Sequence, residues 1–387
     1  MLVIGVIVAV VAACGGLARA DDGDKLIHVD TVYRHGDRAP LSTYRNDPYG
    51  DDAWPQGRGQ LSVLGMSQHY LQGLRVRDRY IRDLKFLKPN YAHQQVAARS
   101  TDTDRTLTSA YSQLAAIYSG SDNGFPSTQN GWPTHWVPVP VHTVDISTEH
   151  LLDADVQCPR MDQKKKEAVQ NPVYQAFMDQ HAFMFKTISA NAGQAITEIN
   201  GLRGFYDVIF CERYNNKTLP AWITDELYEE IATVALTADN YIFGSAGFDR
   251  DEELEMIRLR TGVLIEHICS QFQNSANRGG DYTMTMYSAH DTTVGGILRS
   301  IGAKEAVIGI GMPEYASLVA FELWQTSSND HYVKVYYVDN AYSPFRDITQ
   351  YIGGCGGNSK CPLDTFITRS KPYRATDNEI LDLCKAK

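Results

Sequence analysis

Hydrophobic residues first form a strand-like run that leads into charged residues. Residues 25–33 are typical of a largely buried strand, with apolar side chains at Leu26, Ile27, Val29 and Val32. The run passes directly into Arg34-His35-Gly36. From residue 60 to residue 80, apolar residues recur at mostly helical spacing with polar residues between them. The pattern predicts a strand and then a helix, as in the opening of an α/β fold.

The strand-to-helix step occurs again further along the chain. Residues 94–98 predict a short strand that ends at Arg99, and Thr101-Asp102 supplies an N-cap for a helix through about residue 118. Residues 120–142 are rich in proline and predict an extended loop. Later elements are a strand at 282–287, a helix at 292–301, and strands at 316–324 and 332–338.

The middle of the chain has a different pattern. Residues 162–275 lack convincing strands and carry charged stretches of helical appearance. This order of elements predicts an α/β fold with a mixed, mainly parallel sheet flanked by helices and an inserted helical cap subdomain. We expect residues 21–150 and 256–387 to form the α/β catalytic core and residues 151–255 to form the cap.

The first twenty residues predict a secretory signal peptide. Leu2 to Ala13 is almost wholly apolar, and Ala18-Arg19-Ala20 fits a small-x-small cleavage pattern, so residues 1–20 are set apart from the fold. An uncleaved signal anchor and a bacterial lipobox ending at Cys14 are alternatives. No other apolar stretch reaches the roughly 18 residues that a membrane-spanning helix needs. After cleavage we therefore expect a secreted protein without a membrane span.

Charge limits the partners that the chain can bind. The formal net charge of −10 argues against nucleic acid as a partner. An anionic substrate would have to be held by a local cationic pocket rather than by the overall field. No HxxxH or clustered Cys/His spacing indicates a metal, and we expect no cofactor.

Cysteines and one sequon fit the secretory route. Of the seven cysteines, Cys14 lies in the signal, which leaves an even number, six, for three disulfides. Spacing alone favours one pair, Cys355 with Cys361, across a glycine-rich turn. Buried free thiols are the alternative. Asn216-Lys217-Thr218 matches the acceptor pattern for N-glycosylation, so Asn216 is the expected site.

Residues whose side chains could bind a ligand or take part in catalysis follow three of the predicted strands. Arg34-His35-Gly36-Asp37-Arg38-Ala39-Pro40 places two guanidinium groups and an imidazole within five positions. The planar fork of arginine matches phosphate oxygens, so a phosphoryl group is a natural partner for both arginines. Arg99 and His290-Asp291 follow the other two strands. Because ligands bind beyond the carboxyl ends of strands in such sheets, these residues are expected to meet.

These motifs identify a resemblance. The chain resembles the histidine acid phosphatases, branch 2 of the histidine phosphatase superfamily, over about residues 25–384. It carries the RHGxRxP signature at residues 34–40. Further similar segments are Gly59-Gln60-Leu61 with Gly65-Met66, residues 99–106, and Tyr287-Ser288-Ala289-His290-Asp291-Thr292-Thr293. The likeness is greatest to animal prostatic and lysosomal enzymes, and it implies a core similar to phosphoglycerate mutase.

The resemblance implies a role for each site residue. His35 would be the nucleophile that becomes phosphorylated, and Asp291 would be the proton donor. Arg34, Arg38 and Arg99 would hold the phosphoryl group, and His290 would donate to it. Arg99 would otherwise be an ordinary ion-pair partner of Asp102 or Asp104. Arg105 is interpreted as an ion-pair partner and is left out of the site.

The resemblance also bears on disulfides and assembly. It implies Cys158–Cys384 and Cys355–Cys361. The third bridge departs from the family, because the relatives' partner for Cys211 is replaced by Leu318 and Cys269 is an additional cysteine. We therefore predict Cys211–Cys269. Trp136 and His142 match positions of a subunit contact, which implies a possible homodimer.

The expected function is that of a secreted acid phosphatase acting on phosphate monoesters, with the lysosomal lumen as the alternative location. A phytase-like phosphatase is the nearest enzyme alternative, although His290-Asp291 differs from the His-Ala-Glu run of some phytases. A phosphomutase fits less well, because that branch favours glutamate after Arg-His-Gly. A non-catalytic secreted binding protein on the same fold is the alternative from another class.

Overall fold

The computed structural model describes residues 23–121, 131–134 and 136–386, and the predicted signal peptide lies outside them. The strands are β1 (Lys25–Arg34), β2 (Val96–Ser100), β3 (Met284–Ala289), β4 (Leu318–Gln325), β5 (His331–Val338), β6 (Arg346–Asp347) and β7 (Cys361–Pro362). They form one sheet in the order β2-β3-β1-β4-β5-β6, with β7 paired to β5.

Twelve α-helices lie among the described residues. They are α1 (Val63–Arg77), α2 (Asp104–Ile117), α3 (Pro159–Val169), α4 (Pro172–Gln180), α5 (Ala182–Ala192), α6 (Ile199–Tyr214), α7 (Asp225–Ile242), α8 (Leu254–Arg278), α9 (Asp291–Ser300), α10 (Lys304–Ile308), α11 (Leu363–Ser370) and α12 (Asp377–Leu383). Among the described residues, no helix is long and apolar enough to span a bilayer.

The predicted mixed sheet is confirmed, with its parallel and antiparallel parts separated. Strands β2, β3 and β1 pair in parallel, whereas β4, β5, β6 and β7 pair antiparallel to their neighbours. Parallel pairing is thus less extensive than predicted. The cause is the short loop between β4 and β5, since only antiparallel neighbours can be joined by so few residues. The parallel part carries the predicted site.

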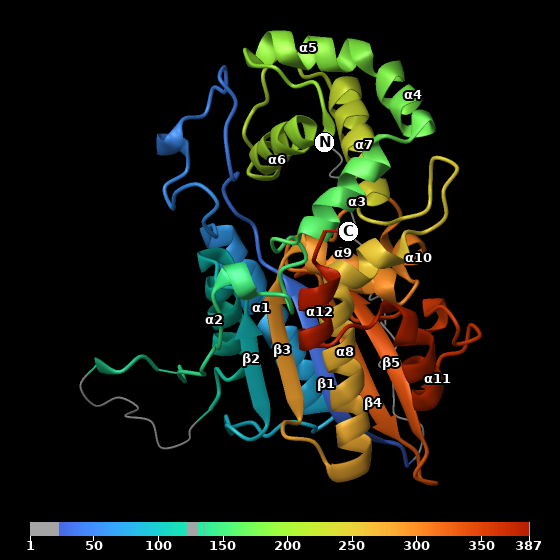
Figure 1. The fold of residues 1–387 in the computed structure, drawn as a ribbon. Helices are drawn as coiled ribbons and strands as arrows, with labels where there is room; N and C mark the ends of the chain where they lie inside the picture. The colour runs from blue at the N-terminus through green and yellow to red at the C-terminus, as the bar shows by residue number, and fades with distance from the viewer. Residues whose placement is uncertain (1–22, 122–130, 135, 387) are drawn as a thin grey trace, which may run out of the picture.

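Two helical layers cover the sheet (Figure 1). One hydrophobic cluster packs α8, α9 and α11 against one face, through residues such as Val32, Phe272 and Phe321. A second cluster packs α1 and α2 against the other face, through residues such as Val29, Val76 and Leu114. Because both faces are buried, apolar residues of β1 point to either face of the sheet.

The polar residues of β1 are buried as well. His28 Nε2 lies 3.0 Å from Gln271 Oε1 and 3.4 Å from the carboxylate of Asp30, which is fully buried. Gln271 also accepts a hydrogen bond from Thr285 on the neighbouring strand at 2.9 Å. These contacts compensate the burial of His28, whereas the Asp30 carboxylate has the ion pair with His28 and accepts no hydrogen bond.

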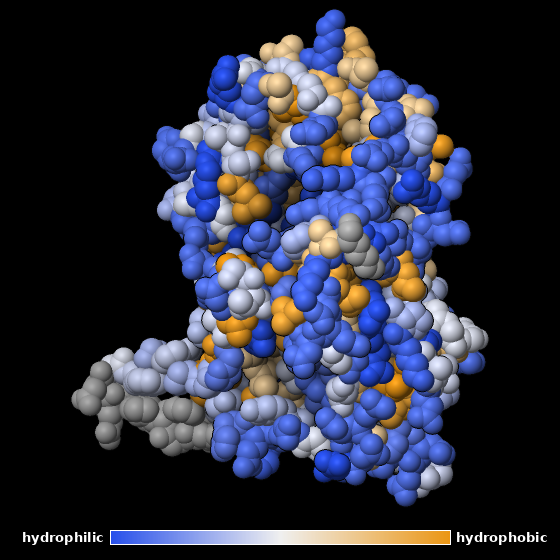
Figure 2. Space-filling view, in the orientation of Figure 1, coloured by the Kyte–Doolittle hydropathy of each residue, from blue (hydrophilic) through white to orange (hydrophobic). Residues whose placement is uncertain are grey.

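Helices α4 to α7 form a separate body above one end of the sheet (Figure 1). They share their own hydrophobic cluster, which includes Ile188, Leu202, Ile209 and Ile231. The surface around them is largely hydrophilic with apolar patches (Figure 2). The region between residues 162 and 275 is helical, as predicted. The division into core and cap at residues 151 and 255 stays a prediction.

The structure contains two of the three expected disulfides. Cys158 is bonded to Cys384 and Cys355 to Cys361. The predicted bond Cys211–Cys269 is wrong, because both residues are buried free cysteines. Cys211 lies on α6, where its sulfur contacts the hydroxyl of Tyr315 at 3.3 Å. Cys269 lies on α8 in the cluster against the sheet. The two helices belong to different bodies, so the two sulfurs do not meet.

This arrangement predicts two protected thiols. Burial raises the pKa of Cys211 and Cys269 to about 12 each, so neither reacts readily in the native state. Alkylation under denaturing conditions without reductant should modify Cys211 and Cys269 and leave the other four described cysteines unmodified. Peptide mapping by mass spectrometry checks this. A peptide pair linked through Cys211 and Cys269 would contradict it.

Candidate active site

The predicted nucleophile follows directly after β1. His35 is buried, and its Nδ1 lies 2.8 Å from the carbonyl oxygen of Gly36. A carbonyl can only accept, so Nδ1 carries the proton and Nε2 keeps its lone pair. Burial, together with the charges of Arg105 and Arg34, lowers the pKa of His35 well below 6.5. The imidazole is therefore neutral in mild acid.

Two glycines fix the loop that carries His35. A Cβ on Gly36 would collide with the backbone of Gly65, and a Cβ on Gly65 would collide with the carbonyl oxygen of Asp37. The loop after β1 thus lies directly against the first turn of α1. This close approach explains why glycine stands at both positions, and it holds the imidazole in place.

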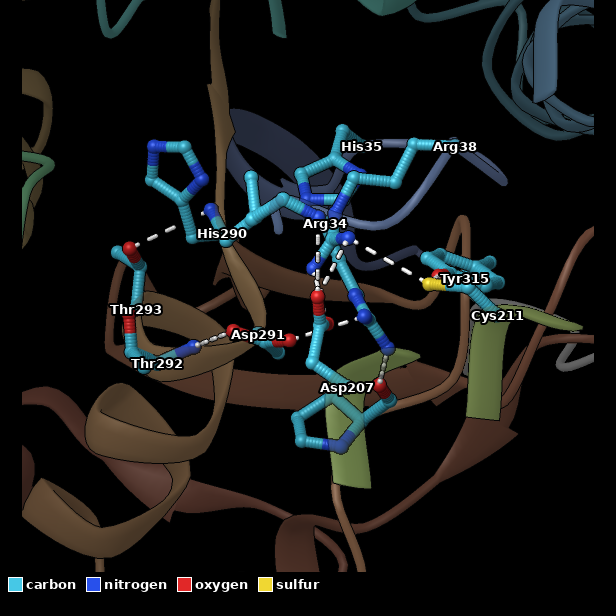
Figure 3. Close-up of polar contacts among 12 residues, drawn as sticks. Arg34, His35, Arg38, Asp207, Cys211, His290, Asp291, Thr292, Thr293 and Tyr315 are labelled. Carbon is cyan, nitrogen blue, oxygen red and sulfur yellow. Dashed lines mark hydrogen bonds and ion pairs between the residues drawn. The ribbon is translucent and has the colours of Figure 1, made fainter. Parts of the chain in front are cut away.

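Arg34 forms an ion pair with Asp291 (Figure 3). Its guanidinium is 2.9 Å from Asp291 Oδ2, donates to the carbonyl oxygen of Pro313 at 2.6 Å, and stacks 4.1 Å from the centre of the Tyr315 ring. Burial raises the pKa of Asp291, but the charges of Arg34 and Arg38 outweigh it and lower that pKa to about 2. Arg34 is therefore placed to orient the carboxylate, while its expected contact with the phosphoryl group stays a prediction.

Arg38 binds the cap. Its guanidinium is bidentate with Asp207 on α6, at 2.7 and 3.2 Å. Asp207 also accepts the backbone N–H of Leu41 at 3.1 Å. A carboxylate of the cap thus aligns a cation of the core. Asp207 was missed in the sequence, where nothing marks this position of α6.

His290 precedes α9 and is neutral. Its Nδ1 accepts from Arg105 Nη2 at 3.5 Å, so its Nε2 bears the proton and donates to Thr101 Oγ1 at 3.0 Å. Burial and Arg105 lower the pKa of His290 to about 3. The rings of His35 and His290 lie 5.7 Å apart at their centres. Strands β1 and β3, which precede them, are adjacent and parallel.

Arg99 does not join the site. Its Nη2 contacts both oxygens of Glu149, at 2.9 and 3.0 Å. Glu149 is fully buried and also accepts the backbone N–H groups of Leu151 and Leu152 at 3.1 Å. Arg99 is thus an ion-pair partner, as one alternative held, although the partner is Glu149 rather than Asp102 or Asp104. Arg99 lies inside β2 and not beyond its end, so its side chain belongs to the sheet.

Arg105 occupies the place expected for Arg99. It lies in the first turn of α2, beside His290, and lines the same cavity as His35 and Arg38. Burial and Arg38 lower its pKa to about 10, so it is charged. Excluding Arg105 from the site was therefore wrong. The signal that could have found it is the helix start after β2, which lies at the same edge of the sheet as the other motifs.

These groups border one cavity of about 550 Å³ between core and cap. His35, Arg38, Arg105, His290 and Asp291 line its inner part. Two cations and a neutral imidazole with a free lone pair can hold a phosphoryl group and attack it. Among the described residues, no group of three or more His, Cys, Asp or Glu is arranged to hold a metal ion.

Known proteins are similar in sequence to this chain along most of its length. Mouse prostatic acid phosphatase is 33% identical over 357 residues, which cover 91% of this chain and 88% of the mouse protein. Human lysosomal acid phosphatase is 33% identical, covering 90% of this chain and 78% of the human protein. The apo form of Hafnia alvei phytase has the same fold, with a TM-score of 0.66 at 14% identity, covering 95% of this chain and all of that one.

The family model agrees with these likenesses. The model described as histidine phosphatase superfamily (branch 2) matches residues 25–338, from the first residue of β1 to the last residue of β5. That span includes every residue of the site described above. The chain belongs to branch 2 of the histidine phosphatase superfamily.

Proposed function

We propose that this acid phosphatase hydrolyses phosphate monoesters through a phosphohistidine on His35. The observation that best supports this proposal is the protonation state of the His35 imidazole. Its Nδ1–H is bound to Gly36, which leaves Nε2 unprotonated in the cavity lined by Arg38 and Arg105. A neutral nitrogen nucleophile beside two fixed guanidinium groups suits attack on phosphorus.

The first step forms an N–P bond and breaks the ester P–O bond. Arg38 and Arg105 stabilise the charge on the phosphoryl oxygens during this transfer. The departing alkoxide takes a proton from Asp291. In the second step water attacks phosphorus, Asp291 accepts a proton from that water, and the N–P bond breaks to release inorganic phosphate. Each group returns to its starting state.

The protonation of Asp291 makes the rate of the reaction depend on pH. The charges that lower its pKa to about 2 are those of Arg34 and Arg38. A bound phosphoryl dianion offsets these charges, so the pKa of Asp291 rises in the complex. The protonated fraction that can serve the leaving group then increases as the pH falls. His35 stays neutral over the same range.

His290 and Arg99 receive different assignments from those expected. A donor role of His290 toward the phosphoryl group requires its Nε2–H, which is directed to Thr101. We propose that His290 acts as a positioning group for Arg105, through the contact at 3.5 Å. Arg99 is proposed to be structural, and Arg105 takes over the contact with phosphate.

We propose an extracellular or lysosomal location. The predicted signal peptide and the two disulfides support an oxidising route. Asn216 is exposed in the turn after α6, which supports its use as a glycan acceptor. Trp136 and His142 are exposed, which supports a homodimer contact. A phytase-like activity is the second candidate, because the similar solved structures from Hafnia alvei and Citrobacter braakii are phytases.

The nucleophile can be tested directly. Replacing His35 with alanine should lower hydrolysis of an aryl phosphate by roughly a thousandfold or more, because the covalent route is lost. Rapid quenching into alkali should trap labelled phosphate on the wild-type chain and not on the variant. His93→Ala, which changes an exposed histidine, is the matched control. Full activity of His35→Ala would exclude the mechanism and favour a binding protein or another route.

Arg105 and Arg99 should respond differently to the same change. Arg105→Met should lower kcat/KM by roughly a hundredfold, because a charge on the phosphoryl oxygens is lost. Arg99→Met should lower the free energy of unfolding by about 2 kcal/mol, because it leaves Glu149 buried without its cation. Steady-state kinetics and denaturant titration measure both. A large loss of kcat/KM in Arg99→Met, with little loss in Arg105→Met, would instead assign the phosphate contact to Arg99.

The leaving group should reveal the role of Asp291. An alkoxide needs a proton more than a nitrophenolate does, so Asp291→Asn should slow hydrolysis of an alkyl phosphate by roughly a hundredfold or more and of nitrophenyl phosphate by less. In the wild type, kcat for the alkyl ester should fall as the pH rises. This decline should vanish in Asp291→Asn. Equal losses for both esters at every pH would contradict the assignment.

A further inference from the structure

The cavity continues beyond the reacting groups along one side of α9. Asp291, Thr292, Gly295, Gly296 and Arg299 all line it, at the spacing of one helix face. With a rise of 1.5 Å per residue, Gly295 lies about 6 Å and Arg299 about 12 Å from Asp291 along the axis. Helix α9 therefore joins the phosphoryl end of the cavity to a far end.

Glycine is present at the two positions of this face, Gly295 and Gly296, for different reasons. A Cβ on Gly296 would lie 2.6 Å from Cγ2 of Thr261, so packing against α8 requires glycine there. A Cβ on Gly295 would meet nothing closer than 3.7 Å, at Pro313, with Cε of Lys304 at 3.9 Å. Packing does not require glycine at 295. Gly295 lines the cavity with its backbone alone, which leaves a narrow strip of wall without a side chain between Asp291 and Lys304.

Lys304 is a buried cation without a counter-ion. Its residue is 6% exposed, and Nζ donates to the carbonyl oxygens of Gly309 at 2.9 Å and Gly311 at 3.3 Å. Within the part of the chain that the structure describes, no carboxylate lies within 4.0 Å of Nζ. Burial and the charge of Arg299 lower the pKa of Lys304 to about 8, while Asp239 and Glu305 act in the opposite direction.

Arg299 is the second such cation. It is 7% exposed and donates to Asn240 Oδ1 at 2.9 Å, Ser245 Oγ at 3.0 Å and the carbonyl oxygen of Phe243 at 3.3 Å. All three acceptors are neutral, and none of the ion pairs among the described residues includes Arg299. Its contacts tie α9 to the end of the cap helix α7 and use three of its five N–H groups.

The other charges of the far end are mostly matched. Arg203 pairs with Asp239 at 2.6 Å, and Arg260 pairs with Asp155 at 2.8 Å. Asp153 accepts a backbone N–H from Asp155. Among the residues that line the far end, Lys304 and Arg299 are therefore two cations set against one remaining carboxylate. Glu305 attracts both cations and Glu252 attracts Arg299 from outside the lining, but neither carboxylate forms an ion pair with them.

Neutral donors would satisfy the same carbonyl and hydroxyl acceptors at lower cost. Burying a charge costs far more free energy than burying an amide or a hydroxyl, unless an opposite charge offsets it. Hydrogen bonds to Gly309, Gly311 and the α7 end do not explain why both side chains are charged. An anion that enters the cavity along α9 would explain it.

We propose that Lys304 and Arg299 form a second anion subsite, so that the preferred substrates are phosphate monoesters whose leaving group carries another phosphate or a carboxylate. The proposal rests on the proposed function, because it places the first phosphoryl group at His35. The strip at Gly295 is the path for the chain between the two anions. Substrate choice then depends on charge at both ends of the molecule.

The test compares two substrates of one length. Hexanediol bisphosphate and the monophosphate of the same diol differ in the distal group alone. In the wild type, kcat/KM for the bisphosphate should exceed that of the monophosphate by roughly ten- to hundredfold, which is the usual effect of charged hydrogen bonds. Its two equivalent phosphates account for a factor of only about two.

Two variants should remove this preference. Lys304→Met keeps the side-chain length and removes the charge, and Gly295→Leu fills the strip while keeping both cations. Either should reduce the ratio of the two kcat/KM values to about two, with the loss mainly in KM. Lys186→Met, which removes an exposed charge on α5, should retain the wild-type ratio and serves as the control. Thermal melting confirms that each variant is folded.

The outcomes separate the two proposals. A wild-type ratio near two, or a folded Lys304→Met with the wild-type ratio, would overturn the subsite while the reaction at His35 stands. Turnover of the monophosphate that survives His35→Ala would instead overturn the proposed function.

Discussion

The concentration of positive charge around one imidazole is the constraint that shapes this protein. Arg34, Arg38 and Arg105 surround His35, and each must be held although they repel one another. Asp291 and the Tyr315 ring hold Arg34, and Asp207 holds Arg38. Helix α9 and the loop before β4 supply the partners of Arg34, and the cap helix α6 supplies the partner of Arg38. Core and cap must therefore be assembled together before the nucleophile is correctly surrounded.

The same charges explain why the reacting groups have their protonation states. A neutral imidazole and an ionised carboxylate side by side would be unusual in mild acid without strong local fields. Here burial and the guanidinium groups lower the pKa of His35, and the guanidinium groups outweigh burial to lower the pKa of Asp291. Phosphate is the one reactant that offsets these fields when it binds. The ground state is thus prepared for attack, and proton donation follows the arrival of substrate.

Sequence reasoning found the elements of the core and most of the site, because both depend on local patterns. Strand β1 and the motif after it lie together in the chain, as do β3 and His290-Asp291. The exchange of Arg105 for Arg99 arose at a boundary, since β2 extends through Ser100 and keeps Arg99 within the sheet. Asp207 and the unpaired Cys211 and Cys269 depend on how the cap sits against the core. No local pattern along the chain reports that contact.

Two buried neutral histidines make the stability of the folded enzyme in acid depend on bound phosphate. The pKa of His290 is about 3 in the folded chain, and that of His35 is also well below 6.5. In the unfolded chain both rings bind protons below about pH 6.5. The free energy of unfolding therefore decreases as the pH falls from 6.5 toward 3. Phosphate bound to the folded state restores part of it by mass action. In acid, the folded chain that holds phosphate should accordingly resist unfolding better than the empty one.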